Sequence, residues 1–190
     1  MKLLRRVVNL VIAPSLRMKF GRMLHWCEYF LSRKQNGYHD LRISANVVAA
    51  TQRLKLEIKD NKTFHLENYR SLLALSYAIN CANSKINVLD FGGSGGGHYF
   101  SARDIFSKSI NKYFVLETPI MAKSASILSD EIITFISSPN ELPSNLSINL
   151  LFSSDTLHYT VDPIKQLSIL LDFRPVIVFL QRHFFRTKLR

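Results

Sequence analysis

The sequence predicts an α/β fold, with a Rossmann-like and mostly parallel sheet that follows a helical region. From Lys85 onward, short apolar runs alternate with amphipathic stretches, which is the pattern of repeated strand–helix units. Before Lys85, apolar residues recur at helical spacing. The first apolar run also opens directly into a glycine-rich segment, residues 92–97. Such a segment is typical of a strand-to-helix turn that approaches a ligand closely.

The C-terminal half contains five candidate strands separated by helix-compatible segments. The strands are expected at residues 86–91, 113–117, 132–136, 148–152 and 175–180. The intervening helices are expected near residues 99–108, 119–129 and 163–171. Right-handed crossovers would gather the carboxyl ends of the strands along one edge of the sheet. We expect the ligand at that edge.

The first 80 or so residues are predicted to be mostly helical. Ser15 is a plausible N-cap for a helix that ends at Asn36-Gly37, and further helices are expected at residues 41–54 and 68–82. We therefore divide the chain into an N-terminal helical region, residues 1–84, and a Rossmann-like domain, residues 85–190. A chain of 190 residues, 47% of them hydrophobic, suits one main core.

The formal charge of +11 is concentrated in the N-terminal third. Residues 1–53 hold ten Lys and Arg against two acids, Glu28 and Asp40. This excess suits an anionic membrane surface, nucleic acid or an acidic substrate such as a lipid-linked saccharide, and equally a solvated helix face. We predict peripheral membrane contact through the basic N-terminus. No specific nucleic acid is predicted, because neither an Asp-Pro-Pro-Tyr-like nor a Cys-based catalytic motif follows the fourth strand.

The cysteines and the hydropathy pattern predict a cytoplasmic protein. Cys27 and Cys81 have neither the density of a disulfide scaffold nor the spacing of a zinc site. No apolar run approaches the roughly 20 residues that cross a bilayer. The opening residues superficially resemble a signal peptide, but their apolar run is short and contains Asn9. We expect a protein that is cytoplasmic or peripheral at the inner face of the membrane.

Acidic and polar residues at three strand ends predict what the glycine-rich loop binds. Asp90 stands just before the first glycine, where nicotinamide-binding loops usually carry no acid and S-adenosylmethionine-binding loops usually do. Glu117 follows Gly96 by twenty-one residues, close to the spacing at which an acid accepts hydrogen bonds from ribose hydroxyls. The predicted cofactor is S-adenosylmethionine, no metal is predicted, and the predicted cofactor-binding residues are Asp90, Gly92, Gly93, Gly95, Gly96, Glu117, Ser153 and Ser154.

Each of these residues also has a purely structural interpretation. Asp90 could be a turn residue, Glu117 a favourable charge at a helix N-terminus, and the two serines simple caps. A nicotinamide-dependent sugar-nucleotide enzyme is the main rival, since the same geometry binds dinucleotides. Asp90 argues against it, as does the absence of a Tyr-x-x-x-Lys motif after Tyr159.

These residues carry a resemblance to the methyltransferase family found with bacterial O-antigen and capsule biosynthesis genes. The resemblance extends from about Gly37-Tyr38 to Phe185, in order along the chain. Its motifs are matched by Leu72-Leu73-Ala74-Leu75, Leu89 to Gly93 with Tyr99-Phe100, Leu116-Glu117-Thr118-Pro119, Ser153-Ser154 with Leu157 and Tyr159, and Asp162-Pro163. The resemblance implies a class I, Rossmann-like methyltransferase fold, but it does not carry over the family's substrates. As the methyl acceptor we predict a saccharide or a surface-polysaccharide precursor.

The chain departs from that family in two places. The fifth strand of the family ends in Asp-Arg-Thr-Pro-Phe, whereas residues 181–185 here are Gln-Arg-His-Phe-Phe, so an acid is lost. Class I methyltransferases also continue past the fifth strand to a β-hairpin. A form truncated after strand five, with impaired activity or with a non-catalytic role in a polysaccharide assembly complex, is therefore an alternative. The oligomeric state is left open.

Methyl transfer needs few catalytic residues, because the cofactor supplies the electrophile and the protein supplies alignment. A sugar hydroxyl would profit from a general base. His158, just after the fourth strand, is the predicted catalytic residue, and His98 beside the glycine loop is the second candidate. A polar surface or capping role is the alternative for both histidines.

Overall fold

The computed structural model describes residues 39–61 and 69–183. The basic N-terminus and the helix expected after Ser15 lie outside these residues. Contacts divide the chain into Met1–Gly37 and Tyr38–Arg190, and only the second unit contains described residues. None of the described helices is both long and apolar enough to cross a bilayer.

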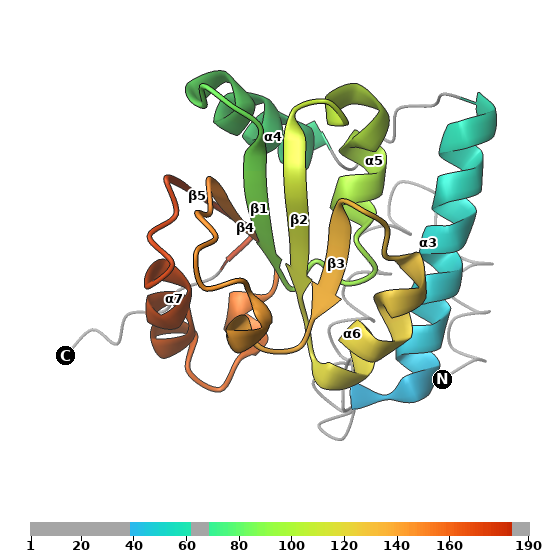
Figure 1. Ribbon diagram of the computed structural model, residues 1–190. Helices are drawn as coiled ribbons and strands as arrows, with labels where there is room; N and C mark the ends of the chain where they lie inside the picture. Colours follow the sequence, from blue (N-terminus) through green and yellow to red (C-terminus); the bar gives the residue numbers. More distant parts are fainter. Residues whose placement is uncertain (1–38, 62–68, 184–190) are drawn as a thin grey trace, which may run out of the picture. The chain divides into compact units, whose positions relative to one another are not determined.

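The described part of the chain contains a sheet of five parallel strands, as the sequence predicts. The strands are β1 (Ile86–Phe91), β2 (Ile110–Leu116), β3 (Ile133–Ile136), β4 (Leu150–Ser154) and β5 (Ile177–Gln181). Their order is β3-β2-β1-β4-β5 (Figure 1), and every neighbouring pair is parallel. The order reverses between β1 and β4, and the carboxyl edge at such a switch point is where open α/β sheets bind ligands.

Helices cover both faces of this sheet. They are α3 (Leu41–Asn61), α4 (Tyr69–Cys81), α5 (Gly97–Phe106), α6 (Pro119–Ala125) and α7 (Pro163–Leu171), with single 3₁₀ turns η3 (Ser126–Leu128), η4 (Pro139–Glu141) and η5 (Leu157–Tyr159). The starts of α6 and α7 follow from local chemistry. Thr118 and Asp162 cap backbone N–H groups of the first turn, and proline occupies the position after each cap.

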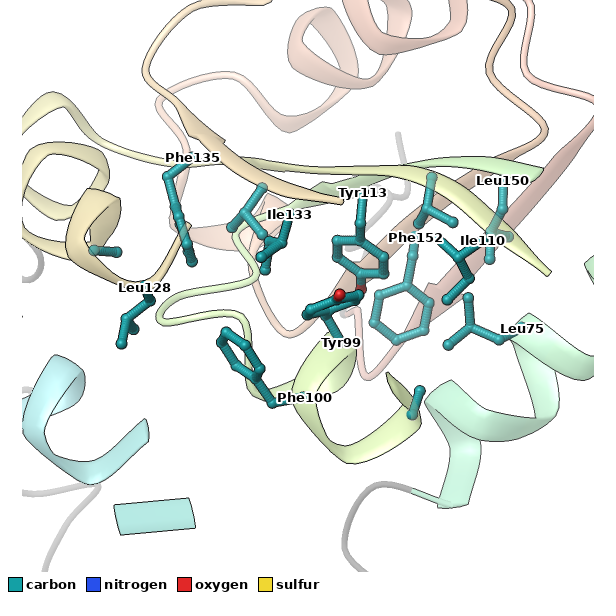
Figure 2. Close-up of a cluster of buried hydrophobic side chains, with 14 of the residues drawn as sticks. Leu75, Tyr99, Phe100, Ile110, Tyr113, Leu128, Ile133, Phe135, Leu150 and Phe152 are labelled. Carbon is teal, nitrogen blue, oxygen red and sulfur yellow. The ribbon is translucent and has the colours of Figure 1, made fainter. Parts of the chain in front are cut away.

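Alternate strand residues face two separate cores, because side chains of a strand point to opposite sides. Val88 packs in the first core with residues of α3 to α6, and Leu89 packs in the second with Leu170 of α7. Figure 2 shows part of the first core, where Tyr99, Tyr113 and Phe152 are fully buried. Fully burying one such side chain contributes roughly 1.5–3 kcal/mol.

Four of the five strands differ from their predicted bounds by one to three residues, and two of these differences have identifiable reasons. β2 begins at Ile110 rather than at residue 113, because Asn111 and Lys112 are exposed and interrupt the apolar pattern. β4 continues through Ser153 and Ser154, whereas the prediction ended the strand at residue 152, where the apolar run gives way to a polar strand end. Both serines are buried within the strand.

Helices α3 and α4 belong to the same compact unit as the sheet. Val48 of α3 and Leu75 of α4 lie in the first core with Val88 of β1. The unit that contains the sheet thus begins at Tyr38, whereas the sequence analysis divided the chain at residue 84. The helical spacing of residues 41–82 identifies the helices, but it does not show which core they join.

Gly96 and Gly97 provide a matched pair for testing the turn from β1 into α5. Gly96 has φ +77°, and a Cβ there would lie 2.7 Å from Ile133 and 3.1 Å from Phe135, whereas a Cβ at Gly97 would meet nothing within 4 Å. We expect Gly96→Ala to lower the free energy of unfolding by about 1–3 kcal/mol. Gly97→Ala should change it by less than about 1 kcal/mol. Denaturant titration of both variants measures this, and equal effects would contradict the geometry of the turn.

Candidate functional site

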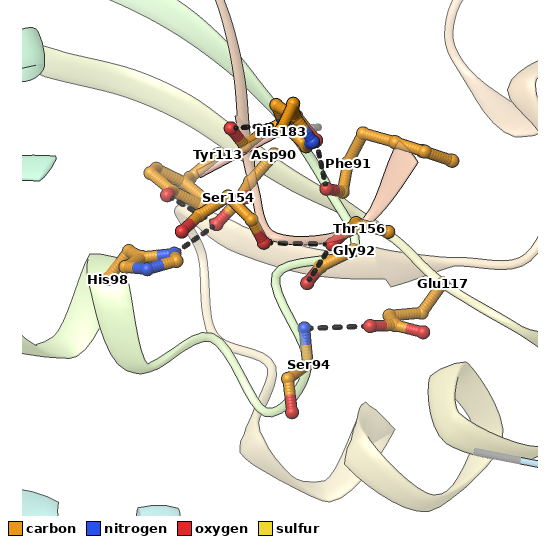
Figure 3. A network of polar contacts seen from close by, with 11 residues as sticks. Asp90, Phe91, Gly92, Ser94, His98, Tyr113, Glu117, Ser154, Thr156 and His183 are labelled. Carbon is orange, nitrogen blue, oxygen red and sulfur yellow. Dashed lines mark hydrogen bonds and ion pairs between the residues drawn. The ribbon is translucent and has the colours of Figure 1, made fainter. Parts of the chain in front are cut away.

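Three residues of the glycine-rich loop after β1 have a left-handed backbone conformation. Gly92 has φ 74°, Gly96 has φ 77° and Ser94, which is not a glycine, has φ 57°. A non-glycine residue in this region is uncommon and costs energy. A hydrogen bond offsets this cost, since the backbone N–H of Ser94 donates to Oε1 of Glu117 at 2.9 Å (Figure 3).

Glu117 lies directly after β2 and is only 8% exposed. Its Oε2 accepts a hydrogen bond from the N–H of Thr118 at 3.0 Å. Burial raises the pKa of the Glu117 carboxyl to about 7, although the bonds from Thr118 and Ser94 act in the opposite direction. A carboxylate oxygen accepts more than one hydrogen bond, so Glu117 can hold the loop and accept ligand hydroxyls together.

Asp90, the next-to-last residue of β1, is completely buried. Its Oδ2 accepts a hydrogen bond from the Tyr113 hydroxyl at 2.8 Å and lies 3.1 Å from Nδ1 of His98 (Figure 3). Gly93 is required beside it, because a Cβ there would lie 2.4 Å from Oδ2. Among the residues that the structure describes, Oδ1 of Asp90 has no hydrogen-bond partner. A buried acceptor without a partner costs about 1–3 kcal/mol and marks a place where a ligand donor fits.

The end of β4 is fastened to the glycine loop. The Ser153 hydroxyl donates to the carbonyl of Phe91 at 3.1 Å. The Thr156 hydroxyl donates to the carbonyl of Ser154 at 2.9 Å and lies 3.4 Å from the carbonyl of Gly92, a second acceptor. The Ser154 hydroxyl is buried, and no described residue is its hydrogen-bond partner. Ser154 can therefore take a ligand, whereas Ser153 serves the strand junction.

Helix α3 lies against the other side of the loop. A Cβ on Gly95 would lie 2.4 Å from the Thr51 hydroxyl and 3.3 Å from Val47. The sequence analysis missed Thr51 and Thr156 as loop neighbours. Thr51 lies about forty residues from the loop in sequence, and no local pattern reveals this contact. Thr156 lies two residues after the predicted Ser153-Ser154 segment. Its place at the same strand end could have identified it as a neighbour of the loop.

Two further histidines lie near the carboxyl ends of β4 and β5. Nε2 of His158 in η5 is 3.4 Å from Oδ1 of Asp155, and its ring centroid is 6.1 Å from that of His183. His183 Nε2 donates to the carbonyl of Ser153 at 3.0 Å. Burial lowers the pKa of His183, and the neighbouring His158 lowers it further. The sequence analysis did not single out His183, although it stands three positions after the last predicted strand.

The structure thus brings the predicted cofactor-binding residues to one edge of the sheet. Asp90, Glu117 and Ser154 lie at the ends of β1, β2 and β4, and the predicted glycines form the loop between β1 and α5. The binding role of each residue remains a prediction.

Comparisons with known proteins give structural matches only. No protein-family model matches the chain, and a search of curated proteins gives no match. A chain from a Haloferax volcanii complex of a methyltransferase activator and a methyltransferase matches 71% of this chain with 18% identity and a TM-score of 0.40. Human N-acetylserotonin methyltransferase with SAM matches 69% of it (15% identity, TM-score 0.44), and the plantazolicin methyltransferase BpumL with SAH matches 72% (12% identity, TM-score 0.45).

The chain spans between 35% and 56% of the length of these solved chains. Matches of such low identity and score carry no information about activity or substrate. The parallel sheet with the order β3-β2-β1-β4-β5 confirms the predicted α/β, Rossmann-like fold.

The raised pKa of Glu117 predicts a pH-dependent stability. The folded-state pKa of about 7 lies above the ordinary value of 4.5. The contribution of Glu117 to the free energy of unfolding is therefore complete below about pH 4.5. It is lost as the pH rises through 7, where the buried carboxyl must ionise. Relative to Glu117→Gln, the free energy of unfolding should fall by at most about 3 kcal/mol between pH 5 and 8.

Denaturant titrations across that pH range measure this difference. The exposed Glu131 supplies the control. Glu131→Gln should keep the pH dependence of the unmutated chain. Parallel curves for Glu117→Gln and the unmutated chain would show that Glu117 ionises normally.

Proposed function

We propose that this chain is an S-adenosylmethionine-dependent methyltransferase. The observation that carries the proposal is the completely buried Asp90 carboxyl, whose Oδ1 has no partner among the described residues at the switch point of the sheet. A buried carboxylate oxygen in this position calls for a cationic or polar donor. The α-ammonium group of S-adenosylmethionine is such a donor.

The remaining donors of the cofactor fit the neighbouring residues. Glu117 would accept hydrogen bonds from the two ribose hydroxyls, because each carboxylate oxygen has capacity beyond its bond to the backbone. The loop of residues 92–97 would let the ligand approach the backbone, and the Ser154 hydroxyl is a further buried polar group at this edge. When bound, the cofactor supplies an electrophilic methyl group on a sulfonium. The residues of this chain align it and exclude water.

For the acceptor we propose a hydroxyl of a saccharide or of a surface-polysaccharide precursor. The support is the resemblance of residues 37–185 to methyltransferases of O-antigen and capsule loci. Three histidines, His98, His158 and His183, lie near the carboxyl ends of the strands, and a neutral imidazole accepts a hydroxyl proton at neutral pH. The test is transfer of a labelled methyl group from S-adenosylmethionine to a panel of nucleotide sugars and lipid-linked saccharides.

Two other functions make different predictions for ligand binding. A nicotinamide-dependent enzyme should be stabilised against heat by NAD or NADP rather than by S-adenosylhomocysteine. A non-catalytic partner of a polysaccharide assembly complex should bind S-adenosylhomocysteine or nothing, and should transfer no methyl group. A ligand that binds only the folded state raises its melting temperature, so thermal-shift measurements with the three ligands separate the cofactor classes.

The Glu117 carboxylate gives the sharpest mutational test of cofactor binding. Glu117→Ala removes charge-assisted hydrogen bonds worth about 1.5–3 kcal/mol. The affinity for S-adenosylhomocysteine should therefore fall by roughly ten- to a hundredfold in calorimetric titration. Glu131→Ala removes an exposed carboxylate just before β3 and should leave the affinity unchanged. Equal affinities for the unmutated chain and Glu117→Ala would exclude the ribose contact.

A further inference from the structure

We propose that His98, held by Asp90, is the group that removes the proton from the acceptor hydroxyl. The inference rests on the proposed methyltransferase function and assigns the proton acceptor of the same site. His98 is the second residue of α5, directly after the glycine loop. Its side chain is 22% exposed, while that of Asp90 is 0% exposed.

The contact with Asp90 determines which ring nitrogen is available. His98 Nδ1 lies 3.1 Å from Oδ2 of Asp90. A carboxylate oxygen only accepts hydrogen bonds, so Nδ1 carries the proton in this contact. In the neutral ring, that tautomer leaves the lone pair on Nε2, on the opposite side of the imidazole from Asp90. This is the arrangement in which a buried acid orients a histidine as a base.

Two further contacts support the orientation of the His98 ring, one through Asp90 and one with the ring itself. The Tyr113 hydroxyl donates to Oδ2 of Asp90 at 2.8 Å and thereby fixes the carboxyl that orients His98. The His98 ring also packs in a T-shaped arrangement with Phe152, with centroids 4.8 Å apart and planes at 69°. Phe152 is in turn stacked on Phe179 of β5 at 5.6 Å. A base whose ring is already oriented loses little freedom when the substrate binds.

His158, the base favoured by the sequence, has a looser partner. Its Nε2 lies 3.4 Å from Asp155, whose side chain is 43% exposed. His98 instead shares its buried carboxyl with the cofactor's expected ammonium site, since Oδ1 and Oδ2 belong to the same Asp90 group. The shorter contact with a completely buried carboxyl therefore favours His98 over His158.

The proposed step couples transfer of the methyl group to removal of the hydroxyl proton. The acceptor O–H proton moves to Nε2 of His98 while the oxygen forms a bond to the methyl carbon. The bond between that carbon and sulfur breaks, and its electron pair stays on sulfur. The products are a methyl ether, a neutral thioether and a protonated His98, which releases the proton to solvent. An acceptor that is already anionic, such as a carboxylate, would not need a base, so a base at this position suits an acceptor that must lose a proton, such as a hydroxyl.

Carbethoxylation by diethyl pyrocarbonate tests this orientation in the full chain, because the reagent attacks unprotonated, accessible imidazole nitrogen. Mass spectrometry follows His98, and the exposed His39 serves as the internal reference. We expect His98 to react at an undiminished rate with saturating S-adenosylhomocysteine. We expect Asp90→Asn to slow the reaction about tenfold relative to His39, because the amide can donate to Nδ1 and move the ring proton to Nε2.

Two variants separate orientation from folding and from cofactor binding. Tyr113→Phe removes the hydroxyl that steadies Asp90 but gives Asp90 no group that donates to Nδ1 of His98, so it should slow the His98 reaction less than Asp90→Asn does. An equal loss in both variants would indicate loss of local structure. His98→Gln should lower methyl transfer to a hydroxyl acceptor by roughly a hundred- to ten-thousandfold. The same change should alter the affinity for S-adenosylhomocysteine by less than about twofold.

The outcomes distinguish this inference from the proposed function. Protection of His98 by S-adenosylhomocysteine, or a large loss of affinity in His98→Gln, would make His98 a cofactor contact and overturn the inference alone. Unchanged reactivity of His98 in Asp90→Asn would show that Asp90 does not orient the ring. This result would also overturn the inference and leave the proposed function standing. If the unmutated chain does not bind S-adenosylhomocysteine, the proposed function itself fails.

Discussion

The burial of the Asp90 carboxyl at the centre of the sheet is the constraint around which the site is arranged. Removing a carboxyl from water is costly unless hydrogen bonds replace the lost hydration. Here Tyr113 from β2 and His98 from α5 approach one oxygen, and Gly93 is small enough to pass beside it. Each of these residues is placed by a different element. A single buried acid thus couples the positions of a strand, a helix and the loop between them.

The glycine loop is held in the same way, from several directions at once. Glu117 binds its backbone from β2, Thr156 packs on Gly92 from the β4 side, and Thr51 of α3 packs on Gly95. Close approach of this kind leaves no room for a Cβ at Gly92 or Gly95. The glycines are therefore required by neighbours within the chain as well as by any ligand. Such a loop reaches its bound geometry with little loss of conformational entropy on binding.

The sheet was predictable because its signals are local. A few consecutive residues are enough to indicate the apolar runs of β1 and β3. The same holds for the starts of α6 and α7, where a proline follows the N-cap. The predicted edge followed from one topological rule, that parallel strands gather their carboxyl ends. The packing of α3 on the loop was not predictable, since the contact of Thr51 with Gly95 joins residues more than forty positions apart. The amphipathic pattern of α3 indicates only that one face is covered.

Individual side-chain roles were predictable to the extent that they depend on strand ends. Asp90 was found because it stands just before the first glycine of the loop, and Glu117 because of its spacing after Gly96. Ser153 and Ser154 were grouped together, yet alternation along β4 sends their side chains to opposite faces, so one supports the junction and the other stays available. His98 ranked below His158 in the sequence because nothing there reveals the 3.1 Å contact with Asp90. That contact depends on the turn of the loop, and therefore on three positive φ angles.

Glu117 joins the stability of the loop to the chemistry of binding. Burial favours its protonated form, while the backbone N–H groups of Ser94 and Thr118 favour the charged form. The pKa of about 7 is the balance between these effects. Ribose hydroxyls that donate to the carboxylate would shift the balance toward the charged form, because they bind that form more tightly. Cofactor binding would then release a proton from Glu117 near neutral pH, and by linkage the cofactor would bind more tightly as pH rises through 7.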